Sequence, residues 1–469
     1  MTIDMARILR LFRLLAWAFL VFCLALVPSW LLISQGSSTP FDEAAHFDFV
    51  DKLAHGEVPE VNEQYGQRTL WMMACLGPES PAWSPIGECK PVGLYDPNLA
   101  PFNGQSSATG YSPTFYIGSA FFYRTLLEID ERVDLSLNEL QLARLANSIW
   151  GGLAAVMVFI VSLRLRISKI NAMCIALCVS SAPALILQFA NVNSDAGGQF
   201  AVVLAFMLAF YANEIFLKKT RMLKSRVCSL LIIFGLLCTI KETTLLVLPG
   251  ALFIALQNTS FAFERNPKAK EWARLVRMTY VVAATLAVAA ITLLSRAIQP
   301  LLRGKGGEDW MAILLPLLNP DSDNLRTLFN ETPHQALSAF SNVPWSDLTD
   351  VFGNYSTIIM SLMPFIFVGG AMYQSRCSDP DSGRGSITST RTIGQAYLIN
   401  LLALPIGAFC LGLASLIVTG TTVTQPRYYM AASTGLVLLG VWSHRDVLGK
   451  IAMKLLILPW LLTVFSIVN

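Results

Sequence analysis

The stretch LFRLLAWAFLVFCLALVPSWLLI, residues 11–33, decides the class of fold. It is about as long as a helix that crosses a bilayer, and it lacks the small-residue cleavage site of a removable signal peptide. The whole chain of 469 residues has the same character, with 54% hydrophobic residues, 14% charged residues and a mean hydropathy of +0.54. We therefore predict an all-α polytopic membrane protein that retains this first span.

Positive charges set the predicted orientation. Arg7, Arg10 and Arg13 precede the first span, which predicts a cytoplasmic N-terminus. When the later spans alternate, the basic stretches 218–226 and 265–277 also lie in the cytoplasm. This register gives eleven spans in total. The other ten are expected near 141–163, 170–190, 196–217, 226–240, 243–259, 278–298, 355–374, 395–418, 428–443 and 451–468.

The predicted spans divide the chain into five parts. Residues 1–33 form the cytoplasmic N-terminus and the first span, and 34–139 form a folded extracytoplasmic loop. Residues 140–298 hold spans two to seven. Residues 299–354 form a second extracytoplasmic loop that could act as a lid, and 355–469 hold spans eight to eleven.

The segment 111–127 is apolar enough to be mistaken for a span. Counting it as one would move the basic residues 164–169 outside and reverse every later loop. We therefore predict that it is an interfacial or re-entrant helix, a juxtamembrane element of the first large loop.

Cysteine usage leaves one question open. Only Cys75 and Cys89, which are 14 positions apart, lie in a long polar loop, whereas the other cysteines lie in or beside apolar segments. If the loop faces an oxidising compartment, the two can form a disulfide, and otherwise they are free thiols.

Motifs of several other protein classes are absent from the sequence. There is no Cys-x-x-Cys or His-x-x-x-His pair, so a structural zinc site has no support. There is also no Gly-x-x-x-x-Gly-Lys loop and no Gly-x-Gly-x-x-Gly turn. We therefore expect no direct use of ATP or a dinucleotide, and no nucleic-acid partner.

The segment 39–47, directly after the first span, carries the first cluster of polar residues. If it is helical, Asp42 and His46 are one turn apart and Glu43 and His46 are three residues apart, so the three side chains can converge. Such a cluster can bind a cation or take a proton. The alternative is that Asp42 caps a short helix and Glu43 favours its positive end.

Three further polar sites fall at the predicted outer ends of spans. They lie at 191–195, 241–242 and 425–429. Ionisable groups at this depth are costly unless they are paired or solvated, so each site is a functional candidate. Because all four sites lie on one predicted face, we expect a shared pocket that suits a lipid phosphate beside a carboxylate.

Each of these sites also has a simpler interpretation. Asp195 could cap the helix that follows it, and Lys241 could pair with its neighbour Glu242 or reach the headgroups. Arg427 could be an interfacial anchor. Arg144, at the outer start of the second span, could join the cations or be a plain interfacial residue.

Together, the motifs resemble those of the GT-C superfamily of multi-pass glycosyltransferases, which includes the protein O-mannosyltransferases and the aminoarabinose transferase of lipid A. The closer resemblance is to an uncharacterised bacterial family with an Asp-Glu-Pro-Ala-His-like motif after the first span. Here 42–46 reads Asp-Glu-Ala-Ala-His, and 111–116 stands where that family has a His-Pro-Pro-Leu-Tyr-like segment. The other matching positions are Asn193–Asp195, Lys241 and Arg427–Tyr428.

Two departures from the family pattern matter. Ala44 replaces the usual proline, which is a mild change. The His-Pro-Pro element has become Tyr-Ser-Pro at 111–113, which leaves any role of that histidine unfilled.

The resemblance implies roles for the acidic residues. Asp42 would be the general base, Glu43 would assist it or bind a divalent cation, and Asp195 would orient the acceptor, sugar or metal. His46 and Asn193 are further candidates for contact with a metal or the substrate. Mg²⁺ or Mn²⁺ is the expected ion if a metal is used, because these hard cations prefer oxygen ligands.

The resemblance also implies the reaction. A polyprenyl-phosphate sugar would be the donor, a cell-envelope glycan or glycolipid the acceptor, and transfer would invert the anomeric carbon. Lys241, Arg427 and Tyr428 would bind the departing lipid phosphate. The expected location is the bacterial inner membrane, with the active site on the extracytoplasmic side.

Three other functions fit parts of the pattern. A translocase for lipid-linked saccharides would place charges near the bilayer midplane on paired repeats, and the sequence has no such repeat. A polymerase or ligase of surface polysaccharide would lack the carboxylate pair after the first span. A non-catalytic envelope-assembly subunit would have kept the fold and lost the chemistry.

Overall fold

The structure of the protein is a computed structural model, and the part of the chain that it describes is helical. Within that part, every regular element is an α- or 3₁₀-helix, and the one β-bridge joins Gln64 to Gln105. The predicted all-α class is therefore confirmed for these residues. They are 5–35, 43–60, 63–75, 86–218, 223–257, 278–289, 367–368, 371–372, 389–419, 430–445, 448 and 450–468.

Four of the described helices are long and apolar enough to cross a membrane, which supports a membrane protein. Each coincides with a predicted span. The predicted loop 299–354 lies outside the described residues, as does most of the predicted span 355–374. The four helices are Ile8–Ser34, Glu139–Arg164, Asp195–Glu214 and Thr390–Phe409.

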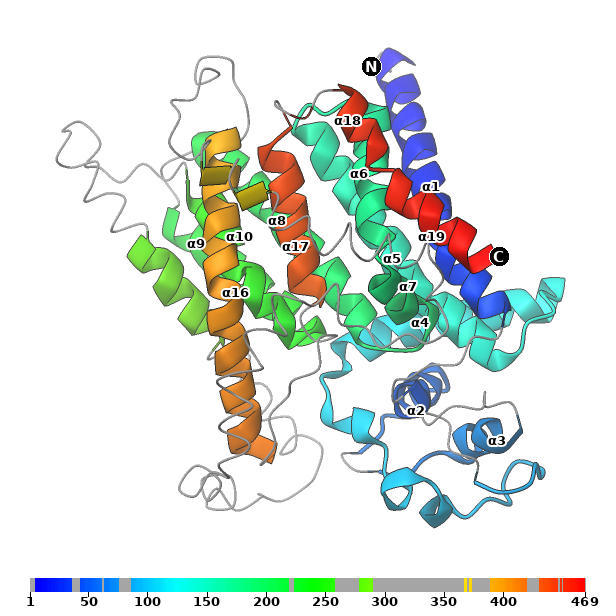
Figure 1. The fold of residues 1–469 in the computed structure, drawn as a ribbon. Coiled ribbons are helices and arrows are strands. Elements are labelled where there is room, and N and C mark those ends of the chain that lie inside the picture. Colours follow the sequence, from blue (N-terminus) through cyan, green and yellow to red (C-terminus); the bar gives the residue numbers. More distant parts are fainter. Residues whose placement is uncertain are drawn as a thin grey trace, which may run out of the picture.

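These helices form a bundle, and two shorter helices lie beyond one end of it (Figure 1). The shorter helices are α2 (Glu43–Ala54) and α3 (Gln67–Cys75). We call this the α2–α3 end. The bundle helices are α1 (Met5–Ser34), α5 (Glu139–Arg164), α6 (Lys169–Ser180), α7 (Pro183–Ala190), α8 (Asp195–Lys218), α9 (Leu223–Ile240), α10 (Leu248–Leu256), α16 (Thr390–Thr419), α17 (Met430–Ser443), α18 (Lys450–Leu455) and α19 (Leu458–Val468).

Three predicted spans are interrupted, which corrects their prediction as single helices. The span 170–190 divides into α6 and α7, and 451–468 divides into α18 and α19. The span 243–259 starts as the 3₁₀-helix η5 (Glu242–Val247) before α10. In each case a proline, Pro183, Pro459 or Pro249, stands in the first two positions of the second helix. A proline has no N–H to donate and disfavours helix at the preceding residue.

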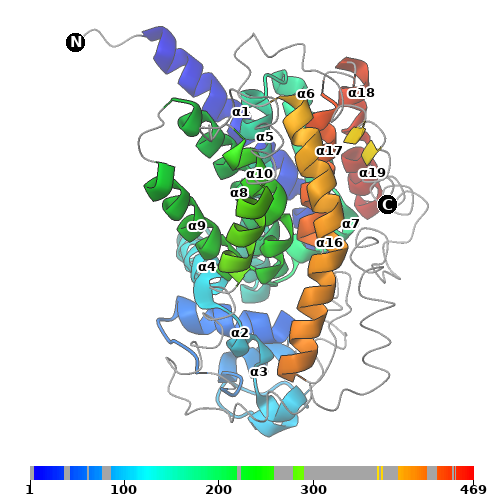
Figure 2. The same cartoon turned by 90° about the vertical axis from the view of Figure 1, so that its left-hand side faces the viewer.

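The apolar segment 111–127 forms most of α4 (Pro113–Val133), which lies between the bundle and α2 in both views (Figures 1 and 2). The Ser112 side chain caps its start and Pro113 occupies its first turn. α4 packs on α2 and on α5, and it is not among the four long apolar helices. This arrangement agrees with its prediction as a helix outside the set of spans.

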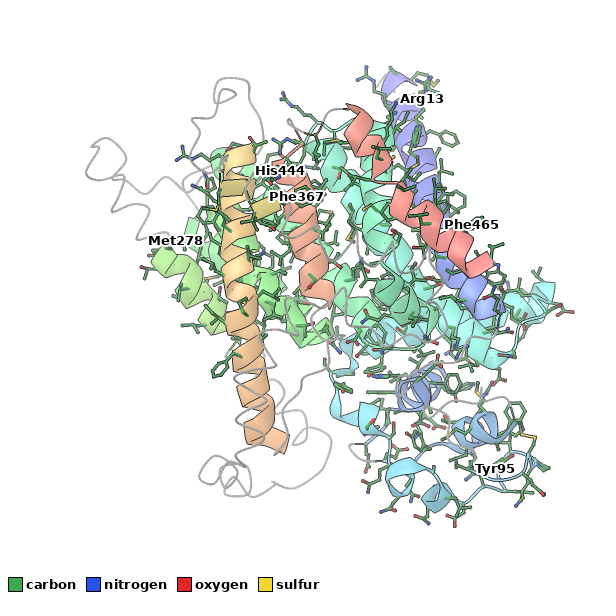
Figure 3. The ribbon with its side chains drawn as sticks, in the orientation of Figure 1. Arg13, Tyr95, Met278, Phe367, His444 and Phe465 are labelled. Atoms are coloured by element: carbon green, nitrogen blue, oxygen red, sulfur yellow. A yellow bond between two sulfur atoms is a disulfide. The ribbon has the colours of Figure 1, made fainter. Side chains whose placement is uncertain are left out.

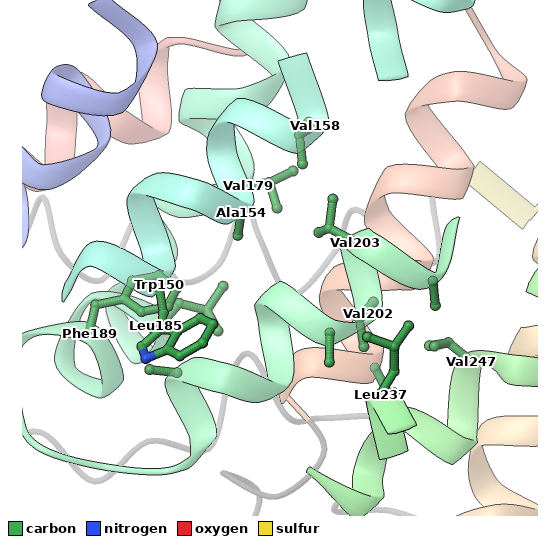
Figure 4. Close-up of a cluster of buried hydrophobic side chains, with 14 of the residues drawn as sticks. Trp150, Ala154, Val158, Val179, Leu185, Phe189, Val202, Val203, Leu237 and Val247 are labelled. Carbon is green, nitrogen blue, oxygen red and sulfur yellow. The ribbon is translucent and has the colours of Figure 1, made fainter. Parts of the chain in front are cut away.

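An aromatic cluster around Trp150 joins α4, α5 and α8. The Trp150 ring lies 5.8 Å from Phe115 and 5.0 Å from Phe200 between centroids. Its indole N–H donates to the Ser119 hydroxyl at 2.9 Å, so the buried polar end of the ring is satisfied. Figure 4 shows Trp150 beside Phe189 of α7, with apolar side chains of the neighbouring helices around them.

Cys75 and Cys89 form a disulfide, which decides between the two alternatives left by the sequence. The bond ties the end of α3 to the loop that follows, near Tyr95 (Figure 3). The Tyr95 hydroxyl donates to the Lys90 carbonyl oxygen at 2.6 Å, and Gln67 of α3 donates to the Tyr95 carbonyl at 2.9 Å. The loop is therefore held against α3 by covalent and polar contacts.

Candidate functional site

A buried ion pair fixes the first turn of α2. Glu43 accepts hydrogen bonds from Arg144 Nε at 2.9 Å and from Arg144 Nη2 at 2.7 Å. It also accepts the backbone N–H of Val192 at 2.8 Å. Glu43 is 0% exposed and Arg144 is 2% exposed. We call Glu43, Arg144 and Val192 the ion-pair clamp.

Arg144 owes its place to the way α5 begins. Asn138 and Gln141 form a reciprocal capping box, in which each side chain accepts the backbone N–H of the other residue. This start places Arg144 and Asn147 on neighbouring turns of one helix face. Both side chains therefore project toward the same region at the α2–α3 end of the bundle.

The turn between α7 and α8 presents the second predicted motif. Asn147 Nδ2 donates to the carbonyl oxygens of Gln188 at 2.8 Å and Asn191 at 2.6 Å, which satisfies backbone groups at the end of α7. The Asn193 side chain then accepts the N–H of Asp195 at 2.9 Å. Asn193 therefore supports the start of α8, and Asp195 is the first residue of that helix rather than the residue before it.

Asp195 instead pairs with Lys241, which lies between α9 and η5. Lys241 is 5% exposed and Asp195 is 4% exposed. The Lys241 ammonium also donates to the Ser194 hydroxyl at 3.1 Å and lies 5.5 Å from the centre of the Tyr111 ring. Lys241 thus points into the protein toward Asp195, rather than outward to headgroups.

His46 and two tyrosines adjoin this pair. His46 Nδ1 and the Tyr116 hydroxyl are hydrogen bonded at 2.6 Å. The His46 ring also stacks on Tyr111, with 5.8 Å between centroids. Tyr111 therefore contacts both His46 and Lys241. We call His46, Tyr111, Tyr116, Ser194, Asp195 and Lys241 the polar site.

The structure brings together five of the predicted site residues, from three of the four predicted motifs. Three others, Asp42, Arg427 and Tyr428, lie outside the described residues, so their place in the site stays a prediction. The five are Glu43, His46, Asn193, Asp195 and Lys241.

The geometry limits what Glu43 can do. Both of its carboxylate oxygens accept hydrogen bonds within the ion-pair clamp. To assist a base or bind a divalent cation, as the resemblance implies, Glu43 would have to share its carboxylate with Arg144 and the Val192 N–H. Among the described residues, no three His, Cys, Asp or Glu side chains converge closely enough to hold a metal ion. A metal at Glu43, His46 and Asn193 would need ligands from elsewhere.

Sequence reasoning missed Asn147 and the role of Tyr116. A usable signal existed for Asn147, because an asparagine inside an otherwise apolar span is costly unless it is hydrogen bonded. Tyr116 ended the segment 111–116 that resembles a family motif and was one of several aromatic residues in an expected interfacial helix, but no role was assigned to it. Its hydrogen bond to His46 joins residues 70 positions apart, and no local pattern predicts it.

A second charged cluster holds α2 in place. Lys52 contacts Asp48 at 3.0 Å and Glu63 at 2.9 Å, and Asp48 also accepts the Gly66 N–H at 2.7 Å. Burial raises the pKa of the Asp48 carboxyl, although Lys52 opposes the shift. These contacts connect α2 with the chain that leads into α3.

Arg68 extends the cluster to α5. It donates to both carboxylate oxygens of Glu139, at 2.7 and 2.5 Å, and its Nε lies 3.6 Å from Asp51 Oδ1. Burial raises the pKa of Asp51 to about 6, against the opposing attraction of Arg68 and His55. The helix that carries Glu43 and His46 is thus fixed to both α3 and α5.

No protein family, curated protein or solved structure matches the chain. The resemblance to GT-C glycosyltransferases therefore depends on the sequence motifs.

Proposed function

We propose that the protein is a membrane glycosyltransferase that moves a sugar from a polyprenyl-phosphate donor to a cell-envelope glycan or glycolipid. The observation that carries the proposal is the buried Asp195–Lys241 pair beside His46 and Tyr111. It joins three motifs that are far apart in the sequence. A carboxylate, an ammonium group and an imidazole gathered in one place suit proton removal and anion binding.

In the proposed reaction, the acceptor hydroxyl oxygen attacks the anomeric carbon while the bond from that carbon to the phosphate oxygen breaks. The hydroxyl proton passes to a carboxylate, which the resemblance assigns to Asp42. The lipid phosphate leaves with the bonding electrons. Attack from the face opposite the phosphate inverts the anomeric carbon. A positioned base typically contributes about 10²–10⁴-fold to such a reaction.

Charge balance favours a role for further cations. Within the described residues, Lys241 faces Asp195 and Arg144 faces Glu43, so each cation already has a carboxylate partner. A phosphate that approached Lys241 would compete with Asp195 for its charge. Arg427 and Tyr428 would supply the additional donors in this proposal, since bound phosphates are commonly held by several charge-assisted hydrogen bonds.

The position of the polar site suits a donor that is bound to a lipid. α1 ends and α5, α8 and η5 begin at the α2–α3 end, where the polar site lies. The sugar-phosphate head of such a donor can only reach the surface of a bilayer. In the proposed topology of eleven spans, the basic N-terminus is cytoplasmic and this end faces the extracytoplasmic side of a bacterial inner membrane.

The test replaces Lys241 by Met and Asp195 by Asn in a strain deleted for the gene. Both variants should insert into the membrane but leave the missing envelope sugar unrestored, and Asp42→Ala should do the same. Lys90→Met and Glu88→Gln change exposed residues of the first loop and should restore the sugar. Restoration by Lys241→Met or Asp195→Asn at the wild-type level would contradict the proposal.

A non-catalytic assembly subunit is the second candidate. This candidate is favoured because Glu43 and Asp195 are each paired with a basic residue. Such buried pairs can have a purely structural role. The two functions differ in their response to Asp195→Asn. A structural subunit that carries this change would restore the envelope whenever it still folds.

A further inference from the structure

The ion-pair clamp lies beside the polar site. In the proposed reaction, however, none of its residues acts directly on the donor or the acceptor. We propose that Arg144 is a positioning residue, which acts through Glu43 to align the first turn of α2 with the turn before α8. This inference rests on the proposed function, because it concerns how that same site is held together. The sequence left two roles open for Arg144, a phosphate-binding cation and an interfacial anchor. The positioning role proposed here differs from both.

The first step is the geometry of the pair. Arg144 Nε and Nη2 meet the two oxygens of Glu43 at 2.9 and 2.7 Å, a parallel arrangement that fixes orientation as well as distance. Both residues are buried. A guanidinium group that is engaged in this way has one edge of its planar fork committed to the Glu43 carboxylate.

The second step is the hydrogen bond from the Val192 N–H to Glu43 Oε1 at 2.8 Å. It makes the Glu43 carboxylate a bridge between α5 and the turn that leads into α8. Three residues after Val192 stands Asp195, which pairs with Lys241. Three residues after Glu43 stands His46, which bonds to Tyr116 and stacks on Tyr111. One carboxylate therefore sets the relative position of two parts of the polar site.

The third step is that α5 provides a fixed base for the clamp. Asn147, one turn after Arg144, binds backbone carbonyls at the end of α7. Gly151 lies one further turn along the same face, and a Cβ atom there would be 2.8 Å from the Phe189 ring. Successive turns of α5 thus hold α7 closely, so a shift of α5 that followed Glu43 would disturb these contacts.

Buried ion pairs often add little net stability, because desolvation offsets their attraction. An ion pair can nevertheless fix the orientation of the groups around it, whatever its contribution to the free energy of unfolding. A displacement of about 1 Å at a reacting group can cost about 10²-fold in rate. Loss of the clamp should therefore reduce transfer more strongly than it reduces folding.

Two double variants separate these effects. The charge swap E43R/R144E restores an ion pair but removes the acceptor for the Val192 N–H. The neutral pair E43Q/R144Q keeps an acceptor at position 43 and replaces the two-point ion pair by weaker amide contacts. Each should retain a melting temperature near that of the wild type in detergent. Each should also lower restoration of the envelope sugar at least tenfold.

Binding of farnesyl phosphate, a short polyprenyl phosphate, gives a further readout. Its affinity, measured by thermal shift, should stay within about threefold of the wild-type value in both double variants, because the clamp aligns the elements that carry His46 and Asp195, whereas Lys241 lies on another element, between α9 and η5. A loss of more than tenfold would overturn the inference and place Arg144 in the phosphate site. Wild-type restoration of the sugar by either folded variant would also overturn it. If the charge swap does not fold, the neutral pair decides.

Failure of the proposed function looks different. In that case farnesyl phosphate would not bind the wild-type protein, and Lys241→Met would restore the envelope. If farnesyl phosphate binds and Lys241→Met is inactive while a clamp variant is fully active, the positioning role alone is refuted.

Discussion

Replacing Asp51 by Asn should stabilise the protein at alkaline pH and leave it unchanged in acid. Asp51 is buried among α2, α3 and α4, where burial raises its pKa from 3.8 to about 6. The folded protein therefore holds the Asp51 proton more tightly than the unfolded chain does. The stability contributed by this group is complete below pH 4 and is lost as the pH rises toward 6.

The expected magnitude follows from the two pKa values. A tenfold change in an acid constant corresponds to about 1.4 kcal/mol, so a rise from 3.8 to about 6 corresponds to roughly 3 kcal/mol. Above pH 7 the ionised Asp51 carboxylate should cost the folded state about this much. This net cost already includes the opposing attraction of Arg68 and His55. Glu139, Asp48 and the buried hydroxyl of Tyr123 also face the group.

The assay is thermal unfolding of the purified protein in detergent between pH 4 and pH 8, followed by tryptophan fluorescence. The melting temperature of Asp51→Asn should exceed that of the wild type at pH 8, and the difference should vanish near pH 4. Glu57→Gln, which changes an exposed carboxylate just after α2, should show no such trend. An Asn variant that melts below the wild type at pH 8 would show that the ion pair with Arg68 outweighs the cost of burial.

Two other changes test the fold around the site. Cys75→Ser should free the loop after α3, lower the free energy of unfolding by about 3 kcal/mol and make the loop easier for proteases to cleave. An unchanged cleavage pattern under non-reducing conditions would argue against the disulfide. Gly197→Ala should lower the melting temperature, because the new Cβ would lie 2.5 Å from the Phe115 ring and 2.9 Å from Ile240, an overpacking cost of about 1–3 kcal/mol. Gly66→Ala, whose nearest neighbours are 3.4 Å away, is its control, and equal effects of the two changes would refute the packing argument.

The sequence predicted the features that depend on local chemistry. Apolar runs of bilayer length identified the helices α1, α5, α8 and α16, because each such run must bury or shield its side chains wherever it lies. The interruption at Pro183 was also readable, since a proline inside an apolar run breaks the backbone hydrogen bonding. The prediction of a single span over 170–190 followed the hydropathy of this segment and did not take the effect of Pro183 into account.

Charge placement predicted which motifs would share one end of the molecule. The three motifs at Glu43, Asp195 and Lys241 lie at the α2–α3 end, because helices that alternate in direction return their polar ends to the same side. The fourth motif, at Arg427, lies outside the described residues.

Only the tertiary structure decided which charge pairs with which. Glu43 meets Arg144, 101 positions away, and leaves Lys241 to Asp195. Sequence alone allowed Lys241 to pair with Glu242 and allowed Asp195 to cap its own helix. The physical reason is that an ion pair depends on the distance and direction between side chains on different helices. Those quantities follow from the packing of α2, α5, α8 and α9, which no local pattern of residues records.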